Sequence, residues 1–320
     1  MIPYSRQYVN NKDISAVIKV LKSDFLTKGP VVKKFEKTIC KNFSSKFAVS
    51  SNSGSSSLQL ACLALGLEKN DLVWTVPVTY AASANCAINC GAKVDFVDIC
   101  PDTFNLSIDK LKQKLAIAKK IKKLPKIIIP VHLAGLPYEQ KKLWELSKKY
   151  KFKIIEDASH AIGAKHYNQK VGNCKWSHIT VFSFHPVKIV TTSEGGASLT
   201  NNKKYYQKML QFRENGIIFD KKQFFKKKEY AGYYEQVSSG FNFRMNELSA
   251  ALGVSQLKNL NKFVKKRNQI AKRYIKELKN LPIKFQKIDN YNYSSYHLMI
   301  INFDMKKTKL IYKEIFNKFR

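Results

Sequence analysis

The stretch "VFSFHPVKIVTTSEGGA" (residues 181–197) leads from an apolar run through Ser183 to a single lysine, Lys188, and on to a Gly-Gly pair. The overlapping run "HITVFSF" (178–184) has the length and β-branched content of a buried strand. Lys188 therefore lies just beyond a predicted strand end. The chain has 51 lysines (57 basic residues minus six arginines), so Lys188 is distinguished by its position and not by its type.

Further apolar runs of strand length alternate with helical patterns along the chain. The helical patterns include "SSSLQLACLALGL" (55–67) and "QKKLWELSKKY" (140–150). The strand-like runs are "KFAVSS" (46–51), "DLVWTV" (71–76), "AKVDFVDI" (92–99), "KIIIPV" (126–131) and "KIIEDA" (153–158). This alternation predicts an α/β fold with a mostly parallel sheet and helices on both faces. Ligands of such sheets bind beyond the carboxyl ends of the strands.

A long helical pattern begins at Met245 and ends near Pro282. It predicts a division of the chain into a large domain, residues 1–244, and a second part, residues 245–320. The second part consists of a connecting helix and the start of a small α/β domain. With 320 residues and 44% apolar content, the chain is long enough for one large core and a smaller one.

Composition narrows the class of protein further. The N-terminus lacks a basic start followed by an apolar stretch, and no run reaches the roughly 20 apolar residues of a membrane span. We therefore expect a soluble cytoplasmic protein without a membrane partner. The six cysteines show neither paired nor Cys/His spacing, which argues against a disulfide framework and a zinc site. We expect reduced thiols and no metal.

The formal charge of +34 comes almost entirely from lysines that are spread over every predicted helix. A nucleic-acid binder concentrates arginines and aromatic residues on one face. The pattern favours a solvated lysine-rich surface without a nucleic-acid partner, and leaves a polyanion-binding protein as the alternative. An anionic ligand such as a sugar nucleotide benefits from such a field.

Residues that follow the other predicted strands supply candidates for a ligand site. "SNSGSSSLQLA" (51–61) places Gly54 and Ser55 where a helix begins, which suits either a bound phosphate or a serine N-cap. "PVTYAASAN" (77–85) places Tyr80 at the mouth of the site, either to stack on a flat ligand or to pack in the core. Asp157 is followed by His160. The carboxylate fits a helix N-cap or a cationic ring nitrogen, and no third ligand supports a metal.

A lysine amine in a sheltered pocket attacks carbonyl groups and forms a Schiff base. A phosphate cradle, a stacking aromatic side chain, an acid for a pyridine nitrogen and such a lysine together suit pyridoxal phosphate. Each signal is ordinary alone. Their common location at strand ends makes the combination informative.

Four sequence blocks resemble the signatures of a known family. They are "LTKGPVVKKFE" (26–36), "EDASHAIGA" (156–164), "FSFHPVKIVTTSEGGA" (182–197) and "GFNFRMNELSAALGVSQL" (240–257). They are similar to those of the DegT/DnrJ/StrS sugar-nucleotide aminotransferases, which are pyridoxal phosphate enzymes of fold type I. The resemblance implies a mostly parallel, seven-stranded sheet. Within the family, "SFHPVK" and "NFRMNE" are most similar to the 4-aminotransferases of the pseudaminic acid pathway.

The resemblance assigns cofactor roles to individual residues. Lys188 forms the Schiff base with the cofactor, Asp157 pairs with the pyridinium nitrogen, and His160 lies beside the phenolic oxygen. Tyr80 stacks on the ring. The phosphate is held by Gly54, Ser55 and Ser183.

Two further groups of residues are implied in the same way. Asn242 reaches the phosphate of the other subunit, which implies a homodimer with shared active sites. The sugar pocket is lined by Tyr4, Asp24, Phe25, Leu26 and Thr27, together with Gly54 and Ser183.

The implied reaction is transfer of an amino group to the 4-keto group of a UDP-linked 4-keto-6-deoxy N-acetyl sugar, with L-glutamate as donor. The product is UDP-4-amino-4,6-dideoxy-N-acetyl-altrosamine. Similar enzymes serve the bacillosamine, perosamine and legionaminic routes. Sugar 3-dehydratases of the same fold carry histidine where this chain has Lys188, so transamination is favoured over dehydration.

The family pattern continues beyond Arg320 with a substrate-facing block. We therefore expect an incomplete small domain, either because the sequence is a fragment or because the domain is truncated. A truncated, inactive homologue stays open as an alternative to an active enzyme.

Overall fold

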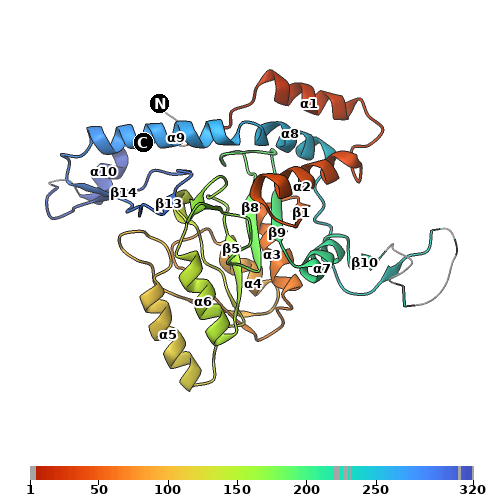
Figure 1. The fold of residues 1–320 in the computed structure, drawn as a ribbon, viewed down its shortest axis with the longest axis horizontal. Coiled ribbons are helices and arrows are strands. Elements are labelled where there is room, and N and C mark those ends of the chain that lie inside the picture. The colour runs from red at the N-terminus through yellow and green to blue at the C-terminus, as the bar shows by residue number, and fades with distance from the viewer. Residues whose placement is uncertain (1–4, 219–223, 226–229, 231, 309–310, 319–320) are drawn as a thin grey trace.

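The computed structural model describes residues 5–218, 224–225, 230, 232–308 and 311–318. Its centre is a seven-stranded sheet (Figure 1). In spatial order its strands are β1 (Phe47–Ser51), β9 (Gly196–Thr200), β8 (Ile179–Ser183), β5 (Lys153–Asp157), β4 (Ile127–Ile128), β2 (Leu72–Thr75) and β3 (Lys93–Phe96). Strands β8, β5, β4, β2 and β3 pair in parallel, and β9 runs antiparallel to both of its neighbours. The predicted α/β fold with a mostly parallel, seven-stranded sheet is confirmed.

Helices cover both faces of the sheet. Side chains alternate between the two faces along each strand, and apolar side chains on both faces are buried by packing against helices. Ile154 packs in the cluster formed with helices α5 (Ile108–Lys120) and α6 (Gln140–Tyr150), whereas Ile155 packs on the opposite face. That opposite face is covered by α3 (Gly54–Ala64), α4 (Ala82–Ile88) and α7 (Lys203–Arg213). Helix α2 (Pro30–Phe43) covers β1, β9 and β8 on the α5/α6 side. The same alternation turns Asp157 toward the α3/α4 face and Glu156 toward α6.

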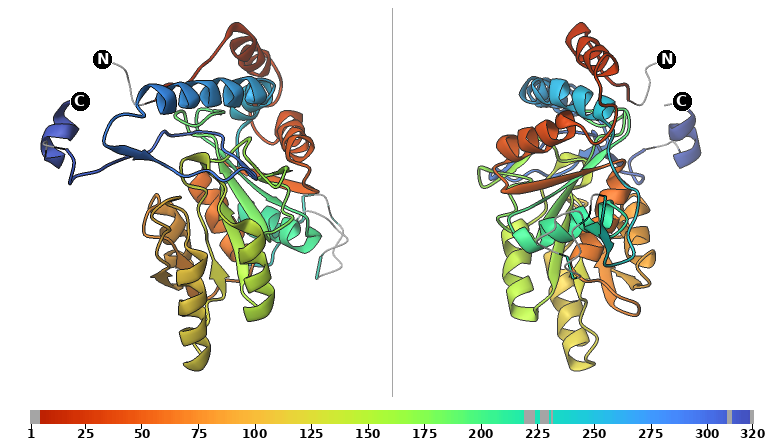
Figure 2. Two further views of the ribbon diagram at one scale, coloured as in Figure 1. Left: turned by 60° about the vertical axis from the view of Figure 1, so that its left-hand side comes forward. Right: turned by 90° about the vertical axis from the view of Figure 1, so that its right-hand side faces the viewer.

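The remaining elements lie around this sheet. Helix α9 lies across one end of it beside α8 and α1, and α5 and α6 extend toward the other end (Figures 1 and 2). The elements that have not yet been given bounds are α1 (Asn11–Leu21), 3-10 turn η1 (Leu133–Gly135), β6 (Lys165–His166), β7 (Gln169–Lys170), β10 (Ile217–Ile218), β11 (Glu235–Gln236), α8 (Glu247–Leu257), α9 (Leu260–Glu277), β12 (Ile283–Phe285), β13 (Asn292–Tyr293), β14 (Ile301–Phe303) and α10 (Tyr312–Lys318). Strand β13 pairs with β6, which joins the C-terminal part of the chain to the region after β5.

The pattern that begins at Met245 forms two helices, α8 and α9, and not one. Lys258 and Asn259 donate backbone hydrogen bonds to residues three positions back, at 3.2 and 2.9 Å. Such bonds tighten the last turn of α8 and redirect the chain. Asn259 occupies the N-cap position of α9, but its side chain makes no capping hydrogen bond, so the break comes from this tight backbone turn.

Strand β4 is shorter than predicted, and one strand of the sheet was not predicted. Regular pairing in β4 stops at Ile128, because Pro130 lacks a backbone N–H and the chain continues only as a bridge between Val131 and Asp157. Strand β9 was not predicted, since its sequence "GASLT" is rich in small residues.

The structure bears on the expectations for the cysteines and for membrane-spanning helices. All six cysteines are free thiols, as predicted. Within the described ranges, no helix combines the length and apolar content needed to cross a bilayer.

Candidate active site

Lys188 lies in a tightly closed loop between β8 and β9. The Phe184 N–H donates to the Gly195 carbonyl at 2.9 Å, and the Thr192 N–H donates to the Phe184 carbonyl at 2.9 Å. These bonds close the loop at its base. The Lys188 N–H donates to the His185 carbonyl at 2.9 Å, which turns the backbone at the lysine itself. The loop therefore holds the lysine at the carboxyl end of β8.

Lys188 is half-buried. Burial lowers the pKa of Lys188 below the ordinary value for lysine, and the nearby Asp157 carboxylate opposes that shift. A lowered pKa increases the neutral fraction of the amine, which is its nucleophilic form. The chemistry expected of Lys188 thus has a physical basis in its surroundings.

Asp157 ends β5 and is only 4% exposed. Its Oδ2 accepts a hydrogen bond from the Ser83 hydroxyl at 2.6 Å, and its Oδ1 accepts one from the Ser159 N–H at 3.1 Å. No helix begins at Asp157 in the described stretch 158–164, so the N-cap interpretation of this carboxylate is wrong. The carboxylate faces the site on the α3/α4 side of the sheet.

His160 lies near both of these groups. Burial and, to a smaller extent, the charge of Lys188 lower the pKa of His160 to about 4, against the opposing effect of Asp157. Its Nδ1 accepts a hydrogen bond from the Ala134 N–H at 3.4 Å. The structure therefore brings Lys188, Asp157 and His160 together, as the sequence predicted.

The start of α3 is the predicted phosphate cradle. The Ser53 hydroxyl caps the helix by accepting from the Ser56 N–H at 3.1 Å, so the serine N-cap is present. The N–H groups of Gly54 and Ser55 lie in the first turn of α3, where backbone N–H groups have no intrahelical acceptor and can bind a ligand. A Cβ at Gly54 would lie 2.9 Å from the Ser183 Cβ. The glycine thus keeps open a space between the helix start and the Ser183 hydroxyl.

Gly196 keeps the same region tightly packed. It pairs with Ser51 on one side and Ser183 on the other. A Cβ there would collide with the Ser53 carbonyl oxygen. The second glycine of the Gly-Gly pair is therefore required where β9 passes the start of α3.

Tyr80 lies one turn before Ser83 and is 76% exposed. Core packing is thus the wrong interpretation of this aromatic side chain. Its ring is exposed just before helix α4, whose Ser83 contacts Asp157.

Two further groups of predicted residues are exposed. Asn242 is exposed and pairs through its backbone with Glu214. Asp24, Phe25, Leu26 and Thr27 are exposed between α1 and α2, where the Leu26 carbonyl accepts from the Glu247 N–H at 3.0 Å. Tyr4 lies outside the described residues. The Ser5 hydroxyl donates to the Val187 carbonyl at 3.0 Å, which joins the N-terminal arm to the Lys188 loop.

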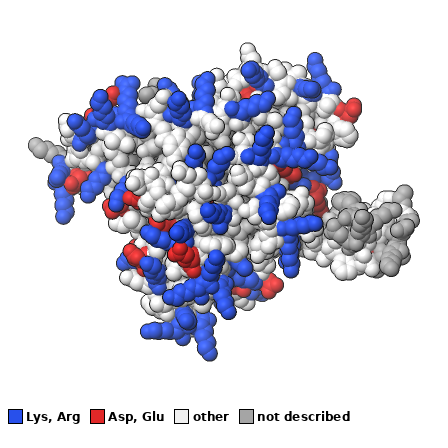
Figure 3. All heavy atoms as spheres, viewed as in Figure 1, with Lys and Arg blue, Asp and Glu red and all other residues white. Residues whose placement is uncertain are grey.

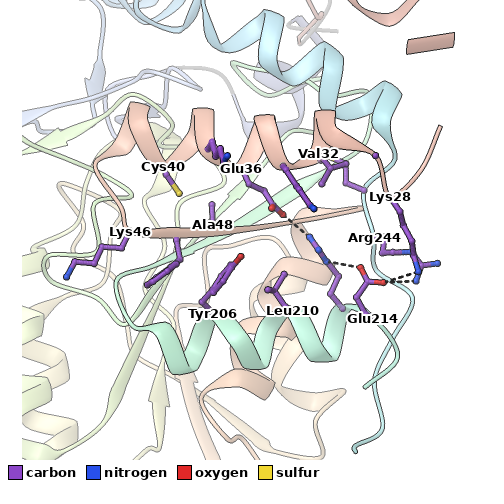
Figure 4. Close-up of a pocket in the computed structure, with 16 residues that line it drawn as sticks. Lys28, Val32, Glu36, Cys40, Lys46, Ala48, Tyr206, Leu210, Glu214 and Arg244 are labelled. Atoms are coloured by element: carbon purple, nitrogen blue, oxygen red, sulfur yellow. Dashed lines mark hydrogen bonds and ion pairs between the residues drawn. The ribbon is translucent and has the colours of Figure 1, made fainter. Parts of the chain in front are cut away.

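A separate hollow of about 560 Å³ lies between α2 and α7 along the free edge of β1 (Figure 4). Glu36 accepts from the Ser50 N–H at 2.9 Å, while Arg213 donates to the Ser50 carbonyl at 3.0 Å and to Glu36 at 2.8 Å. This ion pair satisfies backbone groups that a further strand would otherwise use. None of the predicted site residues lines the hollow.

One face of the molecule shows how the charged side chains are distributed. Figure 3 shows Lys and Arg side chains spread over the visible face, with acidic side chains between them. Among the described residues, no group of three or more His, Cys, Asp or Glu side chains is arranged to hold a metal ion.

The residues of the site fit pyridoxal phosphate. The cradle at Gly54 and Ser183 offers N–H and hydroxyl donors to a phosphate. The buried Asp157 carboxylate suits a protonated ring nitrogen, and the Lys188 amine suits the aldehyde.

Sequence reasoning missed two residues of the site. Ser83 stood inside the quoted "PVTYAASAN" stretch, yet nothing in the pattern marked it as a partner of Asp157. His297 packs its ring against His160, with 4.4 Å between ring centroids, although 137 positions separate the two (297 minus 160). No local signal connects positions that far apart.

The chain is similar to proteins that are already known. A Campylobacter jejuni protein named UDP-4-amino-4,6-dideoxy-N-acetyl-beta-L-altrosamine transaminase is 38% identical over 299 residues, which are 93% of this chain and 75% of the relative. The structure of Helicobacter pylori PseC, an aminotransferase involved in the biosynthesis of pseudoaminic acid, superposes with a TM-score of 0.85 at 31% identity and covers 99% of this chain and 82% of its own.

A Streptococcus pneumoniae protein described as a putative sugar aminotransferase, Spr1654, solved in its PLP form, gives a TM-score of 0.85 at 26% identity and covers 99% of this chain and 82% of its own. Residues 7–319 match the sequence pattern of one family across almost the whole chain. The chain therefore belongs to the DegT/DnrJ/EryC1/StrS aminotransferase family.

Proposed function

We propose that this chain is a pyridoxal phosphate-dependent aminotransferase that aminates the 4-keto group of a UDP-linked 4-keto-6-deoxy N-acetyl sugar. The product is UDP-4-amino-4,6-dideoxy-N-acetyl-altrosamine, a precursor in pseudaminic acid biosynthesis, and the amino donor is L-glutamate. One observation carries the proposal: the half-buried Lys188 lies with Asp157 and His160 at the carboxyl ends of β8 and β5. The names of the Campylobacter relative and of PseC support the choice of sugar.

The residues that would hold the cofactor come from separate elements. Gly54, Ser55 and Ser183 would hold its phosphate through N–H and hydroxyl donors. Asp157 would hold its ring nitrogen, Tyr80 would cover its ring, and His160 would lie beside its phenolic oxygen. When bound, pyridoxal phosphate supplies an aldehyde and a ring that withdraws electrons from the reacting carbon.

The residues of this chain have distinct tasks. The neutral Nζ of Lys188 accepts a proton from the α-carbon of the amino donor and later returns a proton to the sugar carbon, acting as base and then acid. Asp157, fixed by Ser83 and Ser159, keeps a negative charge in place at the buried end of β5. The closed loop from Phe184 to Gly195 holds the backbone of Lys188 in place, so that its side chain starts from a fixed point in both transfers.

The proposal includes a homodimer with shared sites. Asn242 is exposed, so its side chain is accessible to a second subunit. We assign Asn242 to the phosphate of the partner's site. We assign Tyr4 and the segment Asp24 to Thr27 to the sugar pocket. The proposal also places the protein in the cytoplasm, because six free thiols suit a reducing compartment.

The test is an amination assay with the purified chain, pyridoxal phosphate and L-glutamate. UDP-linked 4-keto-6-deoxy N-acetyl sugars of different stereochemistry are supplied as acceptors. We expect amino-sugar formation that depends on Lys188 and shows ping-pong kinetics. Preference for a bacillosamine, perosamine or legionaminic precursor would replace the assigned sugar. Loss of a hydroxyl without amination would indicate a dehydratase.

The same purified chain tests two other classes of protein, an inactive homologue and a polyanion-binding protein. An inactive homologue binds pyridoxal phosphate and aminates none of these sugars. A polyanion-binding protein shows strongly salt-dependent binding to nucleic acid and no cofactor absorbance. Either result would refute the proposed function.

A further inference from the structure

His297 brings a second imidazole to the site, and it comes from the C-terminal part of the chain. It lies between β13 and β14 and is only 5% exposed. Its ring is tilted by 39° against the ring of His160, with 4.4 Å between centroids. Within the described part of the chain its Nδ1 is buried and has no hydrogen-bond partner. The contact between the two histidines is therefore ring packing and not a hydrogen bond through that nitrogen.

The backbone around His297 is anchored on both sides. The Ser295 hydroxyl donates to the His160 carbonyl at 2.9 Å, and the Ser295 N–H donates to the Gly135 carbonyl at 3.0 Å. Arg267 from α9 donates to the His297 carbonyl at 3.1 Å. Gly135 has φ of 98°, and a Cβ there would collide with the Ser295 hydroxyl. This segment is thus built to lie against His160.

His160 is held at Nδ1 by a different element. The Ala134 N–H that donates to Nδ1 comes from η1, where Ala134 itself adopts a left-handed φ of 58°. An acceptor nitrogen carries no proton, so this bond selects the tautomer with the proton on Nε2. One contact fixes the tautomer, and the His297 ring packs beside it.

We propose that His297 is a positioning residue: its ring holds the His160 imidazole beside Lys188 in the orientation in which Nδ1 accepts from the Ala134 N–H, and thereby in one tautomer. The catalytic part of this inference rests on the proposed function. The geometric part does not.

Charges around the pair are consistent with packing between two neutral rings. Lys188 and Arg267 face the pair from the β8–β9 loop and from α9, and Asp157 faces it from β5. Burial lowers the pKa of His297 to about 2 together with the repulsion that a protonated His160, Lys188 and Arg267 would each exert on a second positive charge. Both imidazoles therefore stay uncharged near neutral pH.

The experiment compares two substitutions that differ in ring shape. His297→Phe keeps a flat ring against His160, whereas His297→Leu keeps an apolar side chain without one. The full chain is labelled with ¹⁵N-histidine, no cofactor is added, and the tautomer of His160 is read from long-range ¹H–¹⁵N spectra assigned with His160→Gln. We expect the Nε2–H tautomer in the wild type and in His297→Phe, and a mixture of tautomers in His297→Leu.

Asn268→Ala is the matched control. Asn268 donates to the Ser294 carbonyl at 2.9 Å, so its loss loosens the same segment without changing either ring. A single tautomer retained in His297→Leu overturns the inference. The inference is also overturned if His160 shows the same mixture of tautomers in Asn268→Ala or in His297→Phe as in His297→Leu. Circular dichroism checks folding, and His297→Met replaces the leucine variant if that variant does not fold.

Turnover supplies a second readout. We expect kcat to fall about tenfold or more in His297→Leu, with KM near the wild-type value and with kcat largely kept in His297→Phe. An unchanged kcat in His297→Leu, with an active wild type, overturns the catalytic part. Absence of turnover in the wild type refutes the proposed function, while the tautomer result still decides whether His297 positions His160.

Discussion

The Ser83 hydroxyl donates a 2.6 Å hydrogen bond to Oδ2 of Asp157 and so ties the first turn of α4 to the end of β5. Ser83 also contacts the Thr79 hydroxyl at 2.7 Å. The chain from Thr79 to Ser83, which includes Tyr80, is therefore positioned relative to the carboxylate. The orientation of Asp157 depends on an element far from it in sequence.

Replacement of Ser83 by alanine removes one of the two partners of the Asp157 carboxylate. A hydrogen bond to a charged group contributes about 1.5–3 kcal/mol, so we expect pyridoxal phosphate to bind about tenfold more weakly or worse. Titration of the cofactor followed by absorbance measures this. Thr79→Val, which leaves the Ser83–Asp157 bond intact, is the control. Equal affinity in Ser83→Ala and the wild type would count against a role for Asp157 at the ring nitrogen.

Shared active sites predict complementation between two inactive variants. Lys188→Ala and Asn242→Ala subunits are mixed, dissociated and reassembled. If Asn242 serves the partner's site, each mixed dimer has one site with both residues intact, and up to about half of the wild-type turnover per mixed dimer returns. If Asn242 serves its own site, every site in a mixed dimer lacks one residue, and no turnover returns. The second result would refute the shared site.

The buried Glu156 on the opposite face of β5 predicts a pH-dependent stability. Burial alone raises the pKa of Glu156, but His132, whose Nε2 lies 3.7 Å away, and donors that include Thr180 outweigh it and hold the pKa at about 2. A depressed pKa stabilises the fold at pH values above the ordinary pKa of glutamate, and this stabilisation is lost as the pH falls toward 2. Tyr138 and Gln140 also donate to this carboxylate.

Glu156→Gln should therefore lower the free energy of unfolding at pH 7 by about 3 kcal/mol. The difference from the wild type should shrink as the pH is lowered below 4.5. Urea unfolding at several pH values measures both quantities. A difference that does not change with pH would contradict the ionised state of Glu156.

The Glu247 carboxylate caps a helix far from it in sequence. It is buried and accepts from the N–H groups of Gly29, Val31 and Val32, at 3.0, 2.6 and 3.3 Å. Glu247→Ala leaves the first turn of α2 unsatisfied, so we expect a loss of about 2–3 kcal/mol. Thermal unfolding measures the loss, and the exposed Glu145→Ala serves as control. Equal stability of the two variants would refute the cap.

Much of the fold and site followed from local patterns. Strand-length apolar runs located six strands of the sheet, and residues just beyond their ends included Lys188, Asp157 and Gly54. Parallel strands bring their carboxyl ends to one edge of the sheet, so the closeness of these three residues in space is a consequence of the sheet topology. Family resemblance added roles that the residues alone left open, as with Asp157, where the helix N-cap was the competing interpretation.

Other features depend on contacts that no local pattern records. Strand β9 forms from small residues because Gly196 has to pass close to Ser53. The break between α8 and α9 depends on one turn at Asn259. Ser83 and His297 reach the site through tertiary contacts with Asp157 and His160. The division of the chain at residues 244 and 245 stays a prediction.

Covalent attachment of the cofactor to Lys188 is the central claim, and the abundance of lysine makes its test stringent. The full chain is incubated with pyridoxal phosphate, reduced with borohydride and digested, and labelled peptides are identified by mass spectrometry. We expect the label on Lys188, one lysine among 51, and its loss in Lys188→Ala. Label spread over surface lysines, or label that persists in Lys188→Ala, would contradict the assignment.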